Sequence, residues 1–208
     1  MISTTDLSGL PDVPTLRRLM QSLATLEAML SPEWETRYYS FDSRWAPGET
    51  MGSMRNGTGD QWFALFCRAG AAIVGLDHES VTYTPGAPRP WVFRDLPKEL
   101  HRNVLQEPAF DTGNVTFCAW RLAGDTRWSC GAPRGCRDGS AGLLAILDGS
   151  PAGYLDFARW YHGRDLALDD VATVYRHEPI TPTLLERLSP SLVLETLRED
   201  LDEIGYPA

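Results

Sequence analysis

Residues 49–77 read ETMGSMRNGTGDQWFALFCRAGAAIVGLD and alternate between short runs typical of β-strands and turn-forming segments. The runs are rich in apolar and aromatic residues, and the segments between them, 56–60 and 68–70, contain the glycine or asparagine that tight turns favour. Short turns of this kind join antiparallel strands. The sequence therefore predicts an antiparallel meander with strands at 34–41, 49–55, 61–67 and 71–77.

The clearest helix is predicted just before this meander, at 12–30. Asp12 is suited to cap its start, Pro14 fits its first turn, and Ser31 with Pro32 ends it. Apolar residues recur at helical spacing along this segment, as one buried face requires. They are Leu16, Leu19, Met20, Leu23, Leu26 and Leu30.

The rest of the chain changes from strand-like to helix-like. A proline-rich stretch at 84–90 interrupts the meander and a loop is expected at 130–140, whereas Trp128 is expected in a partner strand for the run at 114–121. Further helices are predicted at 97–106, 151–162, 168–177, 181–188 and 191–203.

This order of elements predicts one domain, 1–208, of the α+β class: an antiparallel β-meander sheet with an N-terminal helix and a C-terminal helical cap. The chain is mainly β over 34–128 and mainly helical over 138–205, and its proline and glycine loops are too short to be linkers.

The composition is that of an ordinary globular protein with an acidic bias. A chain with 43% hydrophobic and 23% charged residues is not disordered, collagen-like or coiled-coil. Its 19 basic and 28 acidic residues give a net charge of −9, which argues against a dedicated nucleic-acid or anionic-membrane binder. No apolar stretch approaches the roughly 20 residues of a membrane-spanning helix, and the first residues do not resemble a signal peptide. We therefore expect a cytoplasmic protein.

The most suggestive polar segment is Asp77-His78-Glu79, at the end of a predicted strand. A histidine between carboxylates is suited to general-base catalysis or metal binding, and equally to a recognition surface. Neighbours on a strand point to opposite faces, so these three side chains do not converge easily on one metal, which favours the structural or recognition role. Asp60, which precedes an aromatic strand, is expected to accept hydrogen bonds from the amides of the turn at 56–60.

No other segment carries a stronger catalytic signature. The turn at 56–60 is glycine-rich but lacks the Lys-Ser/Thr of a phosphate loop, and no G-x-S-x-G occurs. The cysteines Cys67, Cys118, Cys130 and Cys136 show no CxxC spacing and are expected to be free thiols, with a disulfide or a zinc site at the last two as alternatives. We therefore predict no catalytic residue, no metal and no cofactor.

The aromatic residues are numerous for a core of this size. The alternatives are that they fill the core between sheet and helices, or that several lie at the surface, where Trp and Tyr are favoured anchors of protein interfaces. Trp45 is one such candidate. The set comprises Trp34, Tyr38, Tyr39, Phe41, Trp45, Trp62, Phe63, Trp91, Phe93, Trp120, Trp128, Trp160 and Tyr161.

Residues 57–80, GTGDQWFALFCRAGAAIVGLDHES, resemble the middle of SUKH-superfamily proteins, which carry a Gly-Asp, an aromatic strand, a short turn, another strand and an Asp-His-Glu. The helix at 12–30 is in keeping with that family, whereas 110–208 has no place in it. The chain as a whole also resembles bacterial proteins with no assigned activity. The resemblance implies an immunity protein, which binds and neutralises a toxin domain. The matching residues are Gly59, Asp60, Trp62, Val74, Asp77, His78 and Glu79.

We therefore expect a non-enzymatic protein-binding module, of immunity type, whose partner is a basic toxin domain. Its predicted partner-binding residues are Trp45, Asp60, Asp77, His78 and Glu79. One alternative is a small hydrolase or metal-dependent enzyme centred on His78. Another is a structural subunit of a homo-oligomer, which would use the exposed aromatics for self-association.

Overall fold

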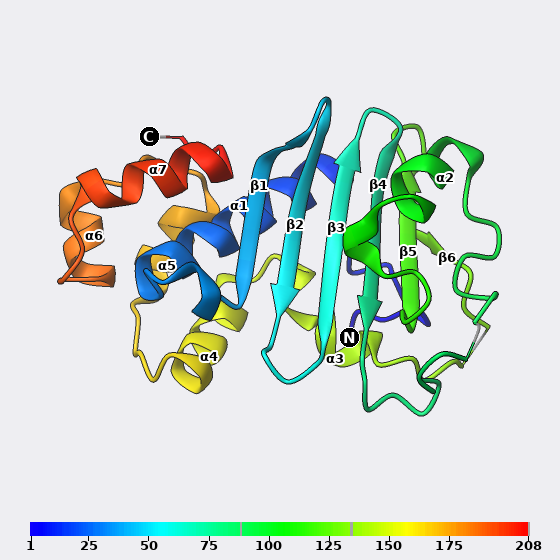
Figure 1. Ribbon diagram of the computed structural model, residues 1–208. Helices are drawn as coiled ribbons and strands as arrows, with labels where there is room; N and C mark the ends of the chain where they lie inside the picture. The colour runs from blue at the N-terminus through cyan, green and yellow to red at the C-terminus, as the bar shows by residue number, and fades with distance from the viewer. Residues whose placement is uncertain (88, 134, 208) are drawn as a thin grey trace.

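The computed structural model describes residues 1–87, 89–133 and 135–207. Pro88, in the predicted proline-rich break, and Arg134, in the predicted loop at 130–140, lie outside these ranges, as does Ala208. The fold is α+β, with an N-terminal helix, a six-stranded antiparallel sheet and C-terminal helices (Figure 1). The predicted fold class is therefore confirmed.

The sheet is a simple meander in which each strand pairs antiparallel with the next along the chain. Its first four strands are joined by turns of a few residues, and a long excursion separates the fourth from the fifth. The strands are β1 (Tyr39–Ala46), β2 (Glu49–Arg55), β3 (Gln61–Cys67), β4 (Gly70–Leu76), β5 (Phe117–Leu122) and β6 (Ser129–Cys130).

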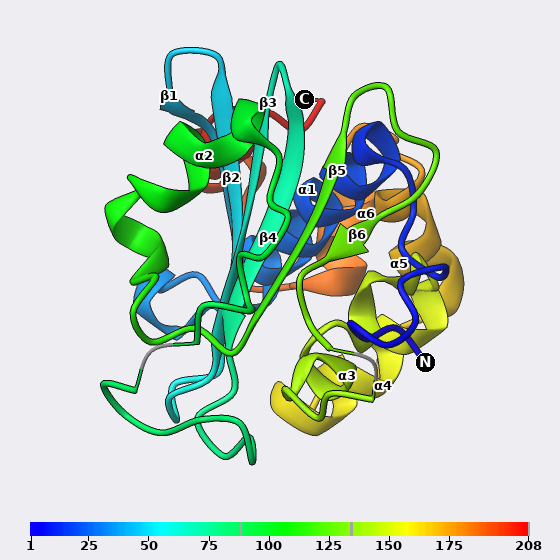
Figure 2. The same ribbon diagram turned by 90° about the vertical axis from the view of Figure 1, so that its right-hand side faces the viewer.

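Alternation along the strands gives the sheet two faces, each with its own apolar cluster. In β3, Trp62, Ala64 and Phe66 belong to one cluster, whereas Leu65 belongs to the other. The first cluster includes helix α1 (Val13–Leu30), and the second includes helix α2 (Lys98–Leu105). Figure 2 shows these two helices on opposite sides of the sheet.

The sequence of α1 accounts for its limits. The Asp12 carboxylate accepts a hydrogen bond from the Thr15 amide at 2.8 Å, a cap that contributes about 1 kcal/mol. Pro14 lies in the first turn, where a missing N–H costs nothing, and the helix ends at Leu30, before Ser31. The predicted N-terminal helix is thus confirmed with its cap.

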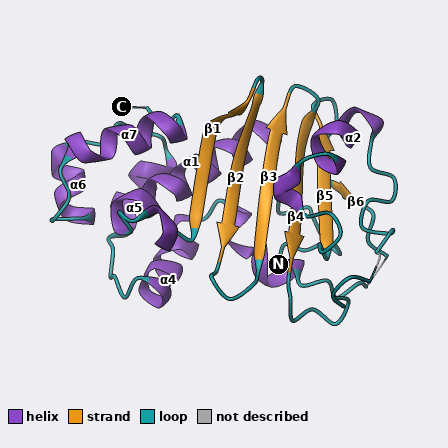
Figure 3. Cartoon of the chain, in the orientation of Figure 1, coloured by secondary structure: helices purple, strands orange, loops and turns teal. Residues whose placement is uncertain are grey.

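The C-terminal helices pack on the same side of the sheet as α1 and share its apolar cluster. All of them except the first surround one end of α1, as the secondary-structure colouring in Figure 3 makes visible. Their bounds are α3 (Ser140–Leu143), α4 (Pro151–Tyr161), α5 (Leu168–Tyr175), α6 (Pro182–Leu188) and α7 (Leu194–Ile204), and short 3-10 turns lie at η1 (Trp34–Thr36), η2 (Pro108–Phe110) and η3 (Ala145–Asp148).

The other face of the sheet is covered unevenly. Helix α2 contacts β3 and β4, and the cluster beneath it draws mainly on β3 to β5 and on the excursion between β4 and β5. Figure 1 shows no helix in front of β1 and β2 on this side. We call this half of the face open because no helix covers it, although neighbouring side chains bury Met51 and Ser53 of β2 there.

Two predicted strand positions are wrong. Residues 34–36 form a 3-10 turn, and the first strand begins only at Tyr39, because Arg37 is held off the sheet by bonds to the Ser31 and Pro32 carbonyls and to the Asp200 carboxylate. Trp128 lies just before β6 rather than in it, and its indole donates instead to the Pro11 carbonyl at 2.7 Å.

Candidate functional site

His78 and Asp60 meet at one end of the sheet. Asp60 precedes β3 and His78 follows β4, and these two strands pair antiparallel, so both residues lie at the same end. The Asp60 Oδ1 accepts hydrogen bonds from the His78 amide at 2.9 Å and from the His78 Nδ1 at 2.6 Å. The contact ties the end of β4 to the β2–β3 hairpin.

The two partners stabilise each other's charged forms. Hydrogen bonding to Asp60 raises the pKa of His78 above its usual value of 6.5. Burial acts to raise the pKa of Asp60, but hydrogen bonds from the His78 amide and imidazole outweigh it and leave that pKa below its usual value. The pair is therefore ionic in weakly acidic solution. A carboxylate on Nδ1 with Nε2 free is also the arrangement that orients a catalytic histidine.

The turn before β3 is held by a different residue from the one predicted. The Asn56 side-chain oxygen accepts from the amides of Thr58 at 2.9 Å and Asp60 at 3.1 Å. The Asn56 amide nitrogen also donates to the Asp60 Oδ2 at 2.7 Å. The expectation that Asp60 binds the turn amides is therefore wrong: Asn56 makes those bonds and leaves Asp60 for His78.

Asp77 and Glu79 lie in a turn rather than on a strand, because β4 ends at Leu76. The Asp77 Oδ1 accepts from the Glu79 amide at 2.9 Å, a local bond that closes the turn. The Asp77 carboxylate packs against Gly139, whose φ of +84° suits a residue without a Cβ. The triplet is thus fixed against the segment that precedes α3.

A groove of about 490 Å³ lies at this junction. Both Asp77 and Glu79 line it, together with Asp138, which is buried. The Asp138 carboxylate accepts from the Ser140 hydroxyl at 2.6 Å and from the Thr4 hydroxyl at 2.5 Å, so its charge is satisfied internally. In this groove Asp77 and Glu79, rather than Asp138, are therefore the carboxylates available to a ligand.

The described residues supply neither a group of metal-ligating side chains nor an activated nucleophile at this site. No group of three or more His, Cys, Asp or Glu side chains in them is placed to hold a metal ion. All four cysteines are free, and burial raises the pKa of the Cys118, Cys130 and Cys136 thiols, which keeps them protonated. Cys67 is half-buried at the edge of the second apolar cluster.

Trp45 lies at the opposite end of the sheet from His78. It is close to the turn between β1 and β2, whereas His78 and Asp60 are next to the other ends of the strands. The Trp45 indole donates to the Glu107 carboxylate at 3.1 Å. The structure thus brings four of the five predicted partner-binding residues together and places the fifth elsewhere.

Trp45 lines a groove of about 440 Å³ on the open half of the sheet, which we call the aromatic groove. Trp34 and Trp45 are 47% and 39% exposed there, a high value for so large an apolar side chain. The Arg55 guanidinium lies 4.9 Å from the centre of the Trp34 ring and fixes its orientation. The lining residues are Trp34, Ser40, Phe41, Asp42, Trp45, Met51, Ser53, Arg55, Phe63 and Glu203.

Acidic residues gather at one side of the aromatic groove. Asp42 and Glu203 both line it, and Asp200 is close by. Burial, followed by the neighbouring charges of Asp42 and Asp200, raises the pKa of Glu203, and the nearby charges of Arg37 and Arg44 offset part of this effect. A cation brought into the groove would relieve this repulsion.

One buried polar cluster was not predicted from the sequence. Glu27 of α1 is fully buried, and its carboxylate accepts from the Tyr154 hydroxyl at 2.9 Å, His162 Nε2 at 2.9 Å and the Tyr38 amide at 2.8 Å. The signal was in the sequence: Glu27 falls four residues after Leu23, on the apolar face of α1.

Searches of protein-family models, curated proteins and solved structures found no match to this chain. The resemblance of residues 57–80 to SUKH-superfamily proteins therefore stays a prediction. None of the described helices has the length and apolar character needed to cross a bilayer.

Proposed function

We propose that this chain is a non-enzymatic protein-binding module of immunity type, which acts in the cytoplasm and neutralises a basic toxin domain. The observation that carries the proposal is the aromatic groove, where two exposed tryptophans, Trp34 and Trp45, lie beside Asp42 and Glu203 on the half of the sheet that no helix covers. Tryptophans in such places are the residues that most often dominate binding energy.

The charge distribution supports a cationic partner. The chain has a net charge of −9, so its field attracts a basic protein at long range and speeds encounter at low salt. Within the groove, Asp42 and Glu203 repel each other, and an Arg or Lys side chain placed between them would reduce the part of that repulsion that Arg37 and Arg44 do not offset. Aromatic faces next to the carboxylates would also attract the same cation.

Capture from a lysate of the source organism, followed by mass spectrometry and measurement of association rates, tests the proposal. The expected result is a stoichiometric basic protein whose association slows as salt rises. Trp34→Ala with Trp45→Ala should weaken its binding about thirtyfold, as the loss of a hot spot of about 2 kcal/mol implies. Trp160→Ala, at a tryptophan that is 71% exposed but outside the groove, is the matched control.

Charge reversals decide whether the aromatic groove or the surface around His78 binds the partner. Asp42→Lys with Glu203→Lys should slow association strongly at low salt, because it reverses the charge inside the groove. Asp77→Lys with Glu79→Lys changes the net charge equally at the far end of the sheet. If only the second pair slows association, the binding surface is at His78 and the aromatic groove is not involved.

A second candidate function rests on the Asp60–His78 pair, whose geometry resembles the orienting half of a catalytic dyad. A hydrolase of this kind would cleave a simple ester or phosphoester, such as para-nitrophenyl acetate or para-nitrophenyl phosphate. The rate of cleavage would then be lost in the variant His78→Gln. The proposed binding function predicts no cleavage that depends on His78.

Self-association is the remaining alternative, because Trp160 and Tyr161 are exposed next to each other on α4. Sedimentation equilibrium of the purified chain distinguishes a monomeric binding module from a homo-oligomer. A monomer whose tryptophans become covered only by the partner is expected, whereas a stable oligomer that Trp160→Ala dissociates would favour the structural subunit.

A further inference from the structure

A second groove, of about 540 Å³, lies on the α1 side of the sheet, at the end where the β1–β2 and β3–β4 turns are. Its volume is within the range of small-molecule sites. We call it the arginine groove. Its lining residues are Val13, Pro14, Arg17, Arg18, Gln21, Gly48, Thr50, Phe66, Cys67 and Arg68.

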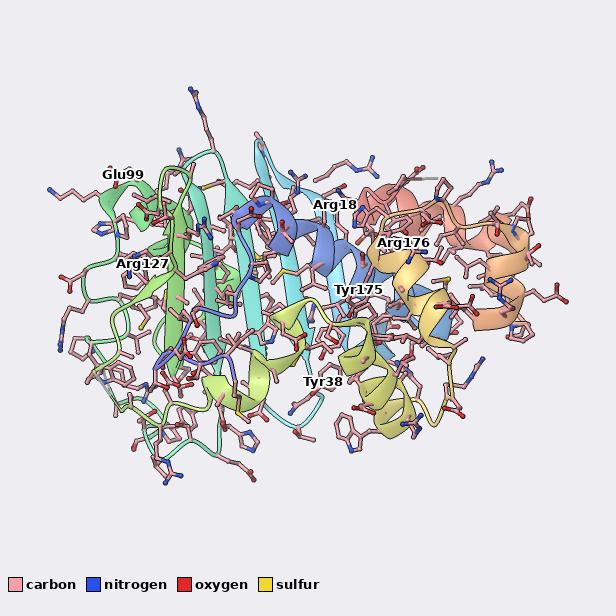
Figure 4. All side chains as sticks on the ribbon, turned by 180° about the vertical axis from the view of Figure 1, so that it is seen from behind. Arg18, Tyr38, Glu99, Arg127, Tyr175 and Arg176 are labelled. Carbon is pink, nitrogen blue, oxygen red and sulfur yellow. The ribbon has the colours of Figure 1, made fainter. Side chains whose placement is uncertain are left out.

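The arginine groove gathers positive charge in a strongly acidic chain. Arg17, Arg18 and Arg68 line it, and no aspartate or glutamate does, although the chain has 28 acidic residues. In the described part of the chain none of these three arginines forms a salt bridge. Arg18 donates to the Arg176 carbonyl at 3.1 Å, and Figure 4 shows the two on the same side of the molecule. The charge of the groove is thus not neutralised within the chain.

Thr50 provides an independent sign of a ligand. It lies on β2 opposite Phe66, it is only 7% exposed, and its hydroxyl has no hydrogen-bond partner among the described residues. A buried hydroxyl without a partner costs about 1–3 kcal/mol, so such groups are rare unless something else binds them. Thr50 lines the arginine groove and its hydroxyl oxygen is enclosed, so a ligand bound there becomes its partner when a neighbouring side chain shifts aside.

We propose that the arginine groove binds an organic phosphate. Guanidinium groups form paired hydrogen bonds with phosphate oxygens, and three of them match a ligand with more than one negative charge. After a small shift of a neighbouring side chain, the Thr50 hydroxyl donates to a phosphate oxygen, and the apolar walls, Val13, Pro14 and Phe66, contact the organic part. This site is on the opposite face of the sheet from the aromatic groove and does not depend on the proposed function.

Calorimetric titration of the full chain with pyrophosphate and with adenosine triphosphate tests the proposal. Saturable binding of at least one probe at one site per chain is expected, and tighter binding of the nucleotide shows that the organic part contributes. Arg17→Gln with Arg68→Gln should weaken binding by at least about tenfold, since each removes a charged hydrogen bond. Arg127→Gln, at an exposed arginine that Figure 4 shows at the other side of the molecule, should leave it unchanged.

The variant Thr50→Val tests whether the groove binds a ligand or only has a structural role. The substitution removes an unpartnered hydroxyl at nearly the same volume, so the urea midpoint of the free protein should stay or rise, while affinity for the probe falls by about tenfold. The proposal is overturned if neither probe binds, if the arginine variants bind as well as the wild type, or if Thr50→Val leaves affinity unchanged.

Discussion

Replacing Glu27 by glutamine should lower the free energy of unfolding far more than a change of one atom suggests. The carboxylate is fully buried in the main apolar cluster and accepts three hydrogen bonds, from Tyr154, His162 and the Tyr38 amide. A glutamine of the same shape keeps one acceptor oxygen. Its amide nitrogen then faces a donor, and at least one of the three donors is left without a partner.

The cost can be worked from these contacts. A buried amide without a partner costs about 1–3 kcal/mol, and the other two hydrogen bonds each weaken by about 1 kcal/mol when the acceptor loses its charge. The expected loss is therefore about 3–5 kcal/mol, which is also the range for broken buried ion pairs. For a chain of this length it corresponds to a fall in Tm of about 6–20 °C.

Urea unfolding followed by tryptophan fluorescence measures this loss as a lower midpoint with an unchanged slope. Tyr154→Phe is the matched variant, because it removes one of the three donors and leaves the carboxylate in place. It should cost about 1.5 kcal/mol, clearly less than the glutamine. A Glu27→Gln protein within about 0.5 kcal/mol of the wild type would refute the reasoning, since surface substitutions behave in that way.

Two further predictions concern pH and packing. The pKa of His78 is raised in the folded state, so the stability from its pair with Asp60 is complete below the unfolded pKa of 6.5 and is lost as pH rises through the folded pKa. Asp60→Asn should flatten that part of a Tm profile measured from about pH 5 to about pH 9, and an unaltered profile would count against the pair. Gly75→Ala places a Cβ into the Phe117 ring and should cost about 1–3 kcal/mol in urea unfolding. Gly142→Ala, where the Cβ has open space, should be neutral or stabilising, and equal effects would contradict this account of the packing.

Regular patterns made most of the fold predictable. Leucine spacing and Asp12 defined α1, and the turns at 56–60 and 68–70 defined the meander. The start of β1 was missed because Trp34, Tyr38 and Tyr39 have strand-like side chains, whereas Arg37 is tied to Asp200 of α7 by a contact distant in the sequence. Local propensity does not register such a contact.

The candidate sites were only partly predictable, for a similar reason. Asp60 and His78 were singled out separately, and pairing of β3 with β4 brings them together. Trp45 was grouped with them, but the direction of β1 places it at the other end of the sheet. The partnership of Trp45 with Trp34, Asp42 and Glu203 depends on the C-terminal helix α7 returning to β1, which no local pattern reveals.

The central claim is that the open half of the sheet is a binding surface for a basic protein. Hydrogen exchange of this chain, alone and in the presence of the captured partner, tests it most directly. Amides of residues 39–55, which form β1 and β2, should become slower to exchange in the complex, and those of residues 77–79 should not change. Protection confined to residues 77–79, or no protection at either end, would contradict the account.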